Sequence, residues 1–371
     1  MRLEADVAIV GGGIMGCSAA WHLRQAGRTV VLLERGVVGA HASGVNFGAV
    51  RRQGRYLPQI PLAMRSREIW STLEERLGTS VEFLPLGHVR LAFDEDHMDR
   101  LEAHQRDVEP YGLSLTLLDR ADVRRRFPWL ADHVVGASLQ PDDGHANPRL
   151  VTPAIARSAA ALGAQILEGQ EVTGIDHDGT AFTVRTAAGL TVRAPVLLNT
   201  AGAWSGWIAE AFGEPVPLRP SAPQQGVTEP LPYAIGPAVS IVDSPIYLRQ
   251  TPRGNVVFGG GRHGRADIAT RRATALPENT EEQLAKVRGV VPHLARARLL
   301  RVWTGVEGYM PDTIPVIGPS ATTPGLFHAF GFSGHGFQLG PAVGAVLAEF
   351  AVSGASQTPV GAFSIARFRK A

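Results

Sequence analysis

A glycine-rich turn near the start of the chain has the spacing of a dinucleotide-binding motif. Gly11-Gly12-Gly13-Ile14-Met15-Gly16 matches the pattern G-x-G-x-x-G, and Glu34 lies 18 residues beyond the last glycine. In such a motif the first glycine makes the turn, the second lets the backbone approach a pyrophosphate, and the third lets helix and strand pack closely. A carboxylate at the position of Glu34 accepts both ribose hydroxyls. The pattern therefore predicts that Gly11, Gly13, Ile14, Met15, Gly16 and Glu34 bind a dinucleotide.

The residues on either side of this turn predict a βαβ unit. Residues 7–10 and 29–34 are apolar, β-branched runs of the kind found in strands buried on both faces, and a helical pattern runs from the turn to Gly27. The N-terminus of that helix has free N–H groups and a partial positive charge, which suit a phosphate. The alternative, a tight strand–helix turn without a ligand, is disfavoured because the turn, both strands and Glu34 occur together.

The rest of the chain alternates between two kinds of pattern. Residues 1–80, 147–215 and 305–371 combine buried strands with helices, whereas 81–146 and 216–304 contain short alternating strands. We therefore predict an α/β fold in which a Rossmann-type domain is interleaved with a domain built on an antiparallel sheet. Within the second domain we expect strands over 81–84, 88–93 and 134–140 and a helix over 96–109.

Composition limits the possible functions. The 371 residues carry a net charge of +2 and are 44% hydrophobic, so a large core is expected and a basic nucleic-acid-binding face is not. Cys17 is the only cysteine, which excludes an internal disulfide and a zinc site made of thiolates, and it is expected to be a small core residue. No metal site, signal peptide or membrane span is predicted, and a cytoplasmic location is the expectation.

Three further segments resemble the D-amino-acid oxidase-like family of FAD enzymes, which includes glycine oxidase and sarcosine oxidase. They are Glu34-Arg35 with Ala42-Ser43-Gly44, then 199–204 (NTAGAW), then 331–338 (GFSGHGFQ) leading into the last helix. The resemblance covers nearly the whole chain and implies a Rossmann-type FAD-binding domain. It assigns FAD contacts to Arg35, Ala42, Ser43, Asn46, Phe47, Gly48, Val172, Gly202, Trp204, Gly331, Ser333, Gly334, His335, Gly336, Phe337 and Gln338.

The resemblance also implies a reaction. Enzymes of this family transfer a hydride from the carbon next to an amine nitrogen to flavin N5, and the resulting imine is hydrolysed. N–H groups of the 331–338 turn, directed at the flavin, would stabilise its reduced form. FAD is expected to bind without a covalent bond, although 41–44 (HASG) also resembles the stretch where dimethylglycine dehydrogenases attach flavin through histidine, here His41.

The sequence indicates the substrate-contacting residues less clearly than the FAD-contacting ones. The chain resembles most closely the opine oxidase catalytic subunits, hydrogen cyanide synthase and the flavin subunits of multi-subunit amino acid dehydrogenases, on residues 46–55 and 302–320. Glu307 stands where an arginine is common in the family, so it either faces a cationic part of the substrate or pairs with a neighbouring arginine. Tyr247 and Arg249 alternate along a predicted strand and share a face, and His263 is interpreted as a loop residue. The predicted substrate-positioning residues are Glu307, Tyr247, Arg249 and Arg51, with Arg52 as another candidate for the carboxylate.

The predicted function is FAD-dependent oxidation of the C–N bond of an amino acid, an N-substituted amino acid or an opine. Additional redox subunits are possible partners. Two alternatives remain: a non-catalytic or electron-relaying FAD subunit of a larger dehydrogenase, and an NAD-linked dehydrogenase, which the 331–338 segment disfavours.

Overall fold

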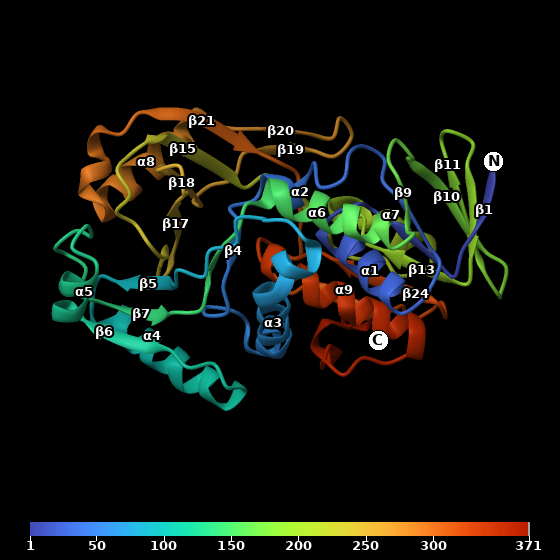
Figure 1. Cartoon of the computed structure of the whole chain (residues 1–371), viewed down its shortest axis with the longest axis horizontal. Helices are drawn as coiled ribbons and strands as arrows, with labels where there is room; N and C mark the ends of the chain where they lie inside the picture. The colour runs from blue at the N-terminus through green and yellow to red at the C-terminus, as the bar shows by residue number, and fades with distance from the viewer. Residues whose placement is uncertain (370–371) are drawn as a thin grey trace.

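The computed structural model describes residues 1–369. Two large sheets form its two halves: a six-stranded sheet with its helices on the right of Figure 1, and an eight-stranded sheet on the left. This arrangement confirms the predicted α/β fold with parallel and antiparallel sheets.

The six-stranded sheet is built around β2 (Val7–Val10). It has the order β23-β24-β13-β2-β3-β9, and all neighbours pair in parallel except β23 with β24. Val7 and Ile9 belong to one hydrophobic cluster, whereas Ala8 and Val10 belong to another on the opposite face. Because alternate side chains of a strand point to opposite faces, a continuous apolar run is what this position requires. The other strands are β3 (Val30–Leu33), β9 (Gln165–Leu167), β13 (Val196–Asn199), β23 (Val316–Pro319) and β24 (Leu326–Phe330).

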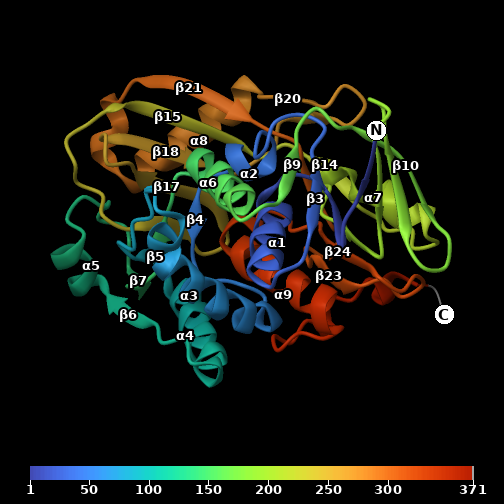
Figure 2. The same cartoon turned by 45° about the vertical axis from the view of Figure 1, so that its right-hand side comes forward.

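Helices cover one face of this sheet and a smaller sheet packs on the other. Figures 1 and 2 show α1 (Ile14–Gln25) beside α9 (Gly336–Ser353), and these helices pack on α6 (Pro148–Ala161) and α3 (Ile60–Leu77). The smaller sheet has the order β1-β12-β11-β10. Its strands are β1 (Arg2–Glu4), β10 (Val172–His177), β11 (Phe182–Thr186) and β12 (Thr191–Ala194).

Helix α9 is a core helix. Within residues 1–369 it is the one helix that is long and apolar enough to cross a membrane, and 72% of it is buried inside the fold. Its contacts with α1 and α3 account for that burial.

The eight-stranded sheet has the order β21-β15-β18-β17-β16-β5-β7-β6, and its neighbours are antiparallel except β16 with β5. Figure 1 shows α8 (Pro277–Val290) near one end of this sheet and α4 (Glu95–Val108) and α5 (Arg120–Arg126) near the other. The strands are β5 (His88–Ala92), β6 (Thr116–Asp119), β7 (Gly136–Gln140), β15 (Gln224–Pro230), β16 (Ala238–Ile241), β17 (Ser244–Gln250), β18 (Asn255–Gly259) and β21 (Leu299–Thr304).

Short elements connect the two halves. The pair β14 (Arg219–Ser221) and β22 (Glu307–Tyr309) joins segments that we assign to different domains, and the domain boundaries themselves stay a prediction. The other short elements are α2 (Ala42–Val45), α7 (Ser205–Ala211), β4 (Ala49–Val50), β8 (Gly144–His145), β19 (Arg265–Asp267) and β20 (Arg272–Thr274), with 3-10 turns at Leu57–Gln59, Glu109–Tyr111, Gly202–Trp204, Pro292–Arg296, Gly361–Phe363 and Ile365–Phe368.

The prediction of a strand over 81–84 is wrong. Only Leu84 makes a bridge, to His145, and the Val81 N–H donates to the Glu74 carboxylate at 2.6 Å rather than to a neighbouring strand. The carboxylate of a preceding helix therefore replaces the sheet partner that the alternating pattern suggested.

Helices α5 and α8 were not expected, because neither has a clear apolar stripe. α5 buries only Val123, and the Asp119 side chain caps it by accepting the Asp122 N–H at 2.8 Å. The buried face of α8 includes the polar residues Asn279 and Gln283. Apolar periodicity, the main signal for a helix in sequence, is weak in both.

Candidate active site

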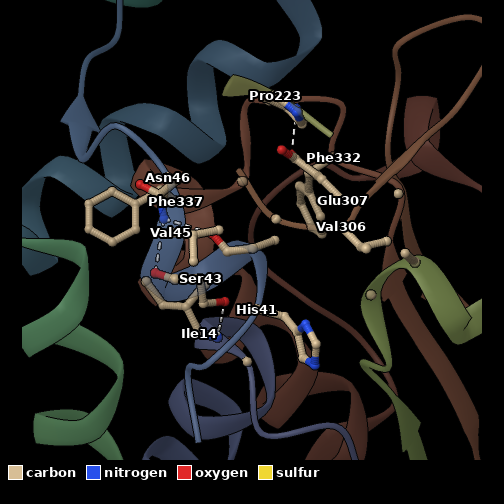
Figure 3. A pocket seen from close by; sticks show the side chains of 18 of the residues that line it. Ile14, His41, Ser43, Val45, Asn46, Pro223, Val306, Glu307, Phe332 and Phe337 are labelled. Carbon is tan, nitrogen blue, oxygen red and sulfur yellow. Dashed lines mark hydrogen bonds between the residues drawn. The ribbon is translucent and has the colours of Figure 1, made fainter. Parts of the chain in front are cut away.

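A large cavity lies where the two halves meet. Its volume is about 720 Å³, and its lining residues come from the β2–α1 turn, the segment 37–55, residues 200–204, β17, β22 and the turn before α9. A volume of this size is typical of ligand sites in proteins. Figure 3 shows Ser43, His41 and Glu307 among the side chains around it.

The first glycine turn forms one wall of the cavity. Gly11 has a φ of +107°, and a Cβ atom there would lie 2.4 Å from the Thr200 carbonyl oxygen. Only glycine is tolerated in such a place. Ser43 Oγ accepts the Ile14 N–H at 2.9 Å and so ties α2 to the start of α1 (Figure 3). Gly16 does not line the cavity: its added Cβ would lie 2.1 Å from the Gly11 carbonyl oxygen, so its role is packing and not the predicted ligand contact.

Glu34 is held in place by backbone amides. Its carboxylate accepts the Gly12 N–H at 2.7 Å and the Gly36 N–H at 2.8 Å, and it lines the cavity at the end of β3. An ionised carboxylate has about four lone-pair sites, so acceptor capacity remains for two ribose hydroxyls.

Aromatic and cationic side chains line the wall beyond Glu34. The Arg35 guanidinium lies 3.6 Å from the centre of the Trp204 ring, and the His41 ring is 5.1 Å from the same ring. Burial, followed by the charge of Arg35, lowers the pKa of His41, which favours its neutral form. Val172 and Gly202 line the same region.

The second glycine turn meets the first. A Cβ atom on Gly336 would lie 3.0 Å from Met15 Cε, and one on Gly331 would lie 2.6 Å from Met310 Cγ, so the turn before α9 is packed tightly. Ser333 has a φ of +51°, which few non-glycine residues adopt. Among residues 1–369 no side chain caps α9, and the first N–H groups of the helix have no partner within it. Both glycine turns line one cavity.

Glu307 lies in the cavity wall without an arginine partner. Its Oε1 accepts the Gly334 N–H at 2.7 Å. Burial raises the pKa of Glu307 to about 7, although the Gly334 N–H opposes this rise. Within residues 1–369 no basic side chain forms an ion pair with Glu307, so the alternative in which an arginine neutralises it is wrong.

Of the two predicted residues on β17, only Tyr247 lines the cavity. Its ring lies 4.4 Å from the Phe47 ring, and its hydroxyl accepts a hydrogen bond from Gln225 at 3.2 Å. Arg249 also contacts Phe47, as the shared face requires, but its Nε donates to the Phe47 carbonyl oxygen at 2.8 Å and its Nη1 lies 3.4 Å from His145 Nδ1. The structure therefore does not support a substrate-positioning role for Arg249, which holds the 47–48 loop.

The neighbouring arginines 51 and 52 point to different places. Arg51 lines the cavity. Arg52 instead forms a buried ion pair with Asp143 at 2.8 Å and lies 3.6 Å from Asp142. Arg52 is therefore excluded as the residue that binds a substrate carboxylate.

Several cavity residues were not predicted. His263 does lie in a loop, yet it lines the cavity and shares a hydrogen bond with Ser221. Arg90 lies in the middle of β5, where nothing in its local pattern distinguishes it from a solvent-facing residue. The unpredicted polar residues of the wall include Arg55, His88, Arg90, Gln225, His263 and Tyr309.

The remaining predicted residues line the cavity together. No set of three or more metal-ligating side chains is found in the part of the chain that the structure describes. The predicted residues that line the cavity are Gly11, Gly13, Ile14, Met15, Glu34, Arg35, Ala42, Ser43, Asn46, Phe47, Gly48, Arg51, Val172, Gly202, Trp204, Tyr247, Glu307, Gly331, Ser333, Gly334, His335, Gly336, Phe337 and Gln338.

Comparison with known proteins identifies the family. The model of the DAO family, described as FAD dependent oxidoreductase, matches residues 6–350. The chain belongs to this family. This DAO-family protein is 30% identical to sarcosine oxidase subunit beta of Rhizobium meliloti (strain 1021), over 98% of the chain and 88% of the relative.

Two further comparisons extend this result. The DAO-family chain is 30% identical to 4-methylaminobutanoate oxidase (formaldehyde-forming) of Paenarthrobacter nicotinovorans, but it spans only 45% of that relative's length. Its fold superposes on the crystal structure of L-proline dehydrogenase from P. horikoshii with a TM-score of 0.93 and 27% identity, covering 99% of this chain and 98% of the other.

The cavity residues fit the FAD of this family. Gly11 has no Cβ atom and so leaves room for the ligand, and the carboxylate of Glu34, held by backbone amides, can accept hydroxyl groups. The N-terminus of α9 offers N–H donors in the same cavity. The protein is an FAD-dependent oxidoreductase.

Proposed function

We propose that this FAD-dependent oxidoreductase oxidises the C–N bond of an N-substituted amino acid to an imine, which water hydrolyses. Two relatives are named for the oxidation of sarcosine and of 4-methylaminobutanoate, both of them by name amine oxidations. When bound, FAD would supply the acceptor for the two electrons that leave, as a hydride, the C–H bond next to the amine nitrogen.

The observation that carries the proposal is the state of Glu307. Its Oε1 is held by the Gly334 N–H, whereas no partner for Oε2 is found among residues 1–369. With a pKa of about 7, this carboxyl group can receive a proton from a substrate ammonium group near neutral pH. Oxidation needs the neutral amine, whose lone pair assists the loss of hydride from carbon. Glu307 would thus bind the amine and remove its proton.

Positive charge for the substrate carboxylate comes from two arginines of the cavity wall. Arg55 is buried and Arg51 is partly buried; both line the cavity, and no carboxylate pairs with either of them among the described residues. A guanidinium binds a carboxylate through two parallel hydrogen bonds, which fixes orientation as well as position. Since most of the rate enhancement in such a reaction comes from holding the reacting carbon in place, this pair would be the main positioning device.

Anaerobic bleaching of the flavin tests the proposal. The holoenzyme is mixed with sarcosine, other N-alkyl amino acids, opines and primary D- and L-amino acids, and the visible flavin absorbance is followed. We expect at least one secondary amine to bleach it. If no amine does so, the result favours the alternative, a non-catalytic or electron-relaying FAD subunit of a larger dehydrogenase.

A partner subunit forms part of the proposal, because one relative is named as a subunit. After anaerobic bleaching, air is admitted with and without an artificial electron acceptor. Slow recovery of the flavin absorbance in air and fast recovery with the acceptor would support transfer of electrons to another protein, whereas fast recovery in air would support an oxidase.

A further inference from the structure

A row of three buried polar side chains lies behind the 200–204 turn of the FAD cavity. Asn199, the last residue of β13, is the direct neighbour of His328 on β24 in the register of the parallel sheet. Both side chains are buried, and so is that of Glu214, which follows α7. None of the three lines the cavity, although residues 200–204 do. Because buried polar atoms need hydrogen-bond partners, these side chains must find them within the fold.

The Asn199 amide closes this turn. Its Nδ2 donates to the Ser205 carbonyl oxygen at 3.0 Å, which joins the end of β13 to the first residue of α7. At the start of the turn, Thr200 Oγ1 donates to the Gly11 carbonyl oxygen at 3.0 Å. The 3-10 turn Gly202–Trp204, which lines the cavity, is therefore held on both sides.

His328 connects that amide to a carboxylate. Its Nε2 lies 3.1 Å from Glu214 Oε2, and its Nδ1 lies 3.1 Å from Asn199 Nδ2. An ionised carboxylate can only accept hydrogen bonds, so His328 Nε2 carries the ring proton and Nδ1 accepts from Asn199. The two hydrogens of the Asn199 amide are thereby both used, one on His328 and one on Ser205.

Glu214 is held as the ionised end of this row. Its Oε1 accepts the Ala321 N–H at 2.6 Å, and its Oε2 accepts the Ser320 hydroxyl at 2.7 Å. Burial raises the pKa of Glu214, but the hydrogen bonds that the carboxylate accepts outweigh burial and lower the pKa overall. A side-chain NH2 group could not take the place of Oε1, because it would face the Ala321 N–H, which is also a donor.

The orientation of the Asn199 amide has a cost. Within residues 1–369 no partner is found for Asn199 Oδ1, although this atom is buried. The reversed amide would give Oδ1 a partner only if His328 Nδ1 carried the proton, and it would place Oδ1 against the Ser205 carbonyl oxygen. The orientation that closes the turn therefore depends on which ring nitrogen is protonated, and the contact with Glu214 determines that.

We propose that Glu214 and His328 are positioning residues for the FAD site. The carboxylate keeps the His328 proton on Nε2, this tautomer keeps the Asn199 amide on the Ser205 carbonyl oxygen, and that bond keeps the 200–204 turn in the shape that lines the cavity. The inference concerns how the cofactor is held. It goes beyond the proposed function, because it requires nothing of the substrate.

The variant Glu214→Gln should reverse the tautomer. The Ala321 N–H needs the glutamine oxygen, so the NH2 group faces His328 Nε2, which must then accept a hydrogen bond. The ring proton moves to Nδ1, the Asn199 amide rotates, and its bond to Ser205 is lost. We expect FAD to bind about 10-fold more weakly, the change typical of losing one buried hydrogen bond. The dissociation constant is measured from the rise in free-flavin fluorescence when the holoenzyme is diluted.

The ring nitrogens of His328 report the tautomer directly. NMR spectra of holoenzyme with ¹⁵N-labelled histidine distinguish a proton on Nε2 from one on Nδ1, and the His328 signals are those that disappear in His328→Phe. We expect the Nε2 proton in wild type and the Nδ1 proton in Glu214→Gln. The matched control is Glu349→Gln on α9, whose carboxylate accepts hydrogen bonds from Arg65 and Ser356 outside the cavity. It should change neither the FAD affinity nor these signals.

A double variant separates positioning from general support of the fold. In His328→Phe no ring nitrogen forces the Asn199 amide to rotate, so FAD affinity should fall less than in Glu214→Gln. When Glu214→Gln is combined with His328→Phe, FAD should bind as it does to His328→Phe alone, because Glu214 acts only through the ring. Asn199→Leu removes the bond to Ser205 directly and should weaken FAD binding as much as Glu214→Gln does.

Three results would overturn the inference. They are an unchanged FAD affinity in Glu214→Gln or Asn199→Leu, an unchanged tautomer in Glu214→Gln, and a loss caused by Glu214→Gln that persists beside His328→Phe. The last result would mean that Glu214 acts by supporting the loop at 320–321. Urea titrations identify a variant that has lost its fold, and if Glu214→Gln is one, Asn199→Leu decides. No substrate enters these measurements, so failure of amines to bleach the flavin would leave the inference standing.

Discussion

Replacing Glu307 by glutamine should make the substrate-free holoenzyme more stable and less active. The pKa of Glu307 rises from an ordinary value of 4.5 to about 7 because the carboxylate is buried. At about 1.4 kcal/mol per pKa unit, the charged form costs the fold about 3 kcal/mol. A neutral glutamine of the same shape avoids that cost, but it can neither accept a proton nor attract a cationic amine.

The difference in the free energy of unfolding between Glu307→Gln and the wild type should depend on pH. A carboxyl group whose pKa is raised in the folded state stabilises the fold fully below pH 4.5, and that contribution is lost as the pH rises through about 7. The free energy of unfolding of Glu307→Gln, from urea titrations, should therefore match wild type at pH 4.5 and exceed it by up to about 3 kcal/mol at pH 8.

Activity should change in the opposite direction. Flavin bleaching by the best secondary amine should slow by about 100-fold in Glu307→Gln, the usual effect of losing a general base. It should also lose the rise with pH near 7 that we expect of wild type. Glu281→Gln, at an exposed position of α8, is the control and should shift stability by less than about 0.5 kcal/mol. Equal stability of the Glu307→Gln and wild-type proteins at pH 8, or unchanged selectivity among opines and N-alkyl amino acids, would refute the role given to Glu307.

Three other outcomes are expected. Gly11→Ala should lose FAD, seen as a lower ratio of flavin to protein absorbance, whereas Gly27→Ala should keep it, because Gly27 has a positive φ of +76° but nothing within 4 Å of an added Cβ atom. Acid precipitation should leave the yellow colour in the supernatant, since no covalent bond to His41 is predicted; colour in the pellet would contradict this. Asp143→Asn should lower the free energy of unfolding by about 3 to 5 kcal/mol because its buried arginine partner loses its counter-ion. The exposed Asp142→Asn should lower it by less than about 1 kcal/mol in the same urea titration.

The elements that sequence predicted well are those that local chemistry determines. The turn at Gly11 requires glycine because of its own φ angle and its approach to residue 200, and the flanking strands are apolar on both faces because both faces are buried. The last helix could be predicted for the same reason, as its apolar run and the preceding glycines are contiguous. Such features depend on neighbours within a few residues or on a motif of fixed spacing.

The positions of the arginines could not be predicted this way. Arg51 and Arg52 are adjacent in the chain, yet one lines the cavity and the other pairs with Asp143, an acid 91 residues away. Arg249 was expected near the substrate because it alternates with Tyr247. It does share that face, but its Nε donates to the carbonyl oxygen of residue 47 instead. Which partner a long cationic side chain finds depends on distant segments, and no local pattern encodes it.

The contrast among these arginines bears on function. Arg52 is buried and paired with Asp143, whereas within residues 1–369 no acid pairs with Arg51, Arg55 or Arg90, although Asp143 lies close enough to influence Arg51 and Arg55. A chain that needed these charges only for its fold would place acids beside them. Without acidic partners the three arginines lower the stability of the fold, but their hydrogen-bond donors stay free for a ligand. Glu307 likewise keeps a carboxylate free in the same cavity at a cost in stability. The charged groups without a partner are concentrated on the cavity wall. We therefore expect the ligand to supply the charged partners of both the arginines and Glu307.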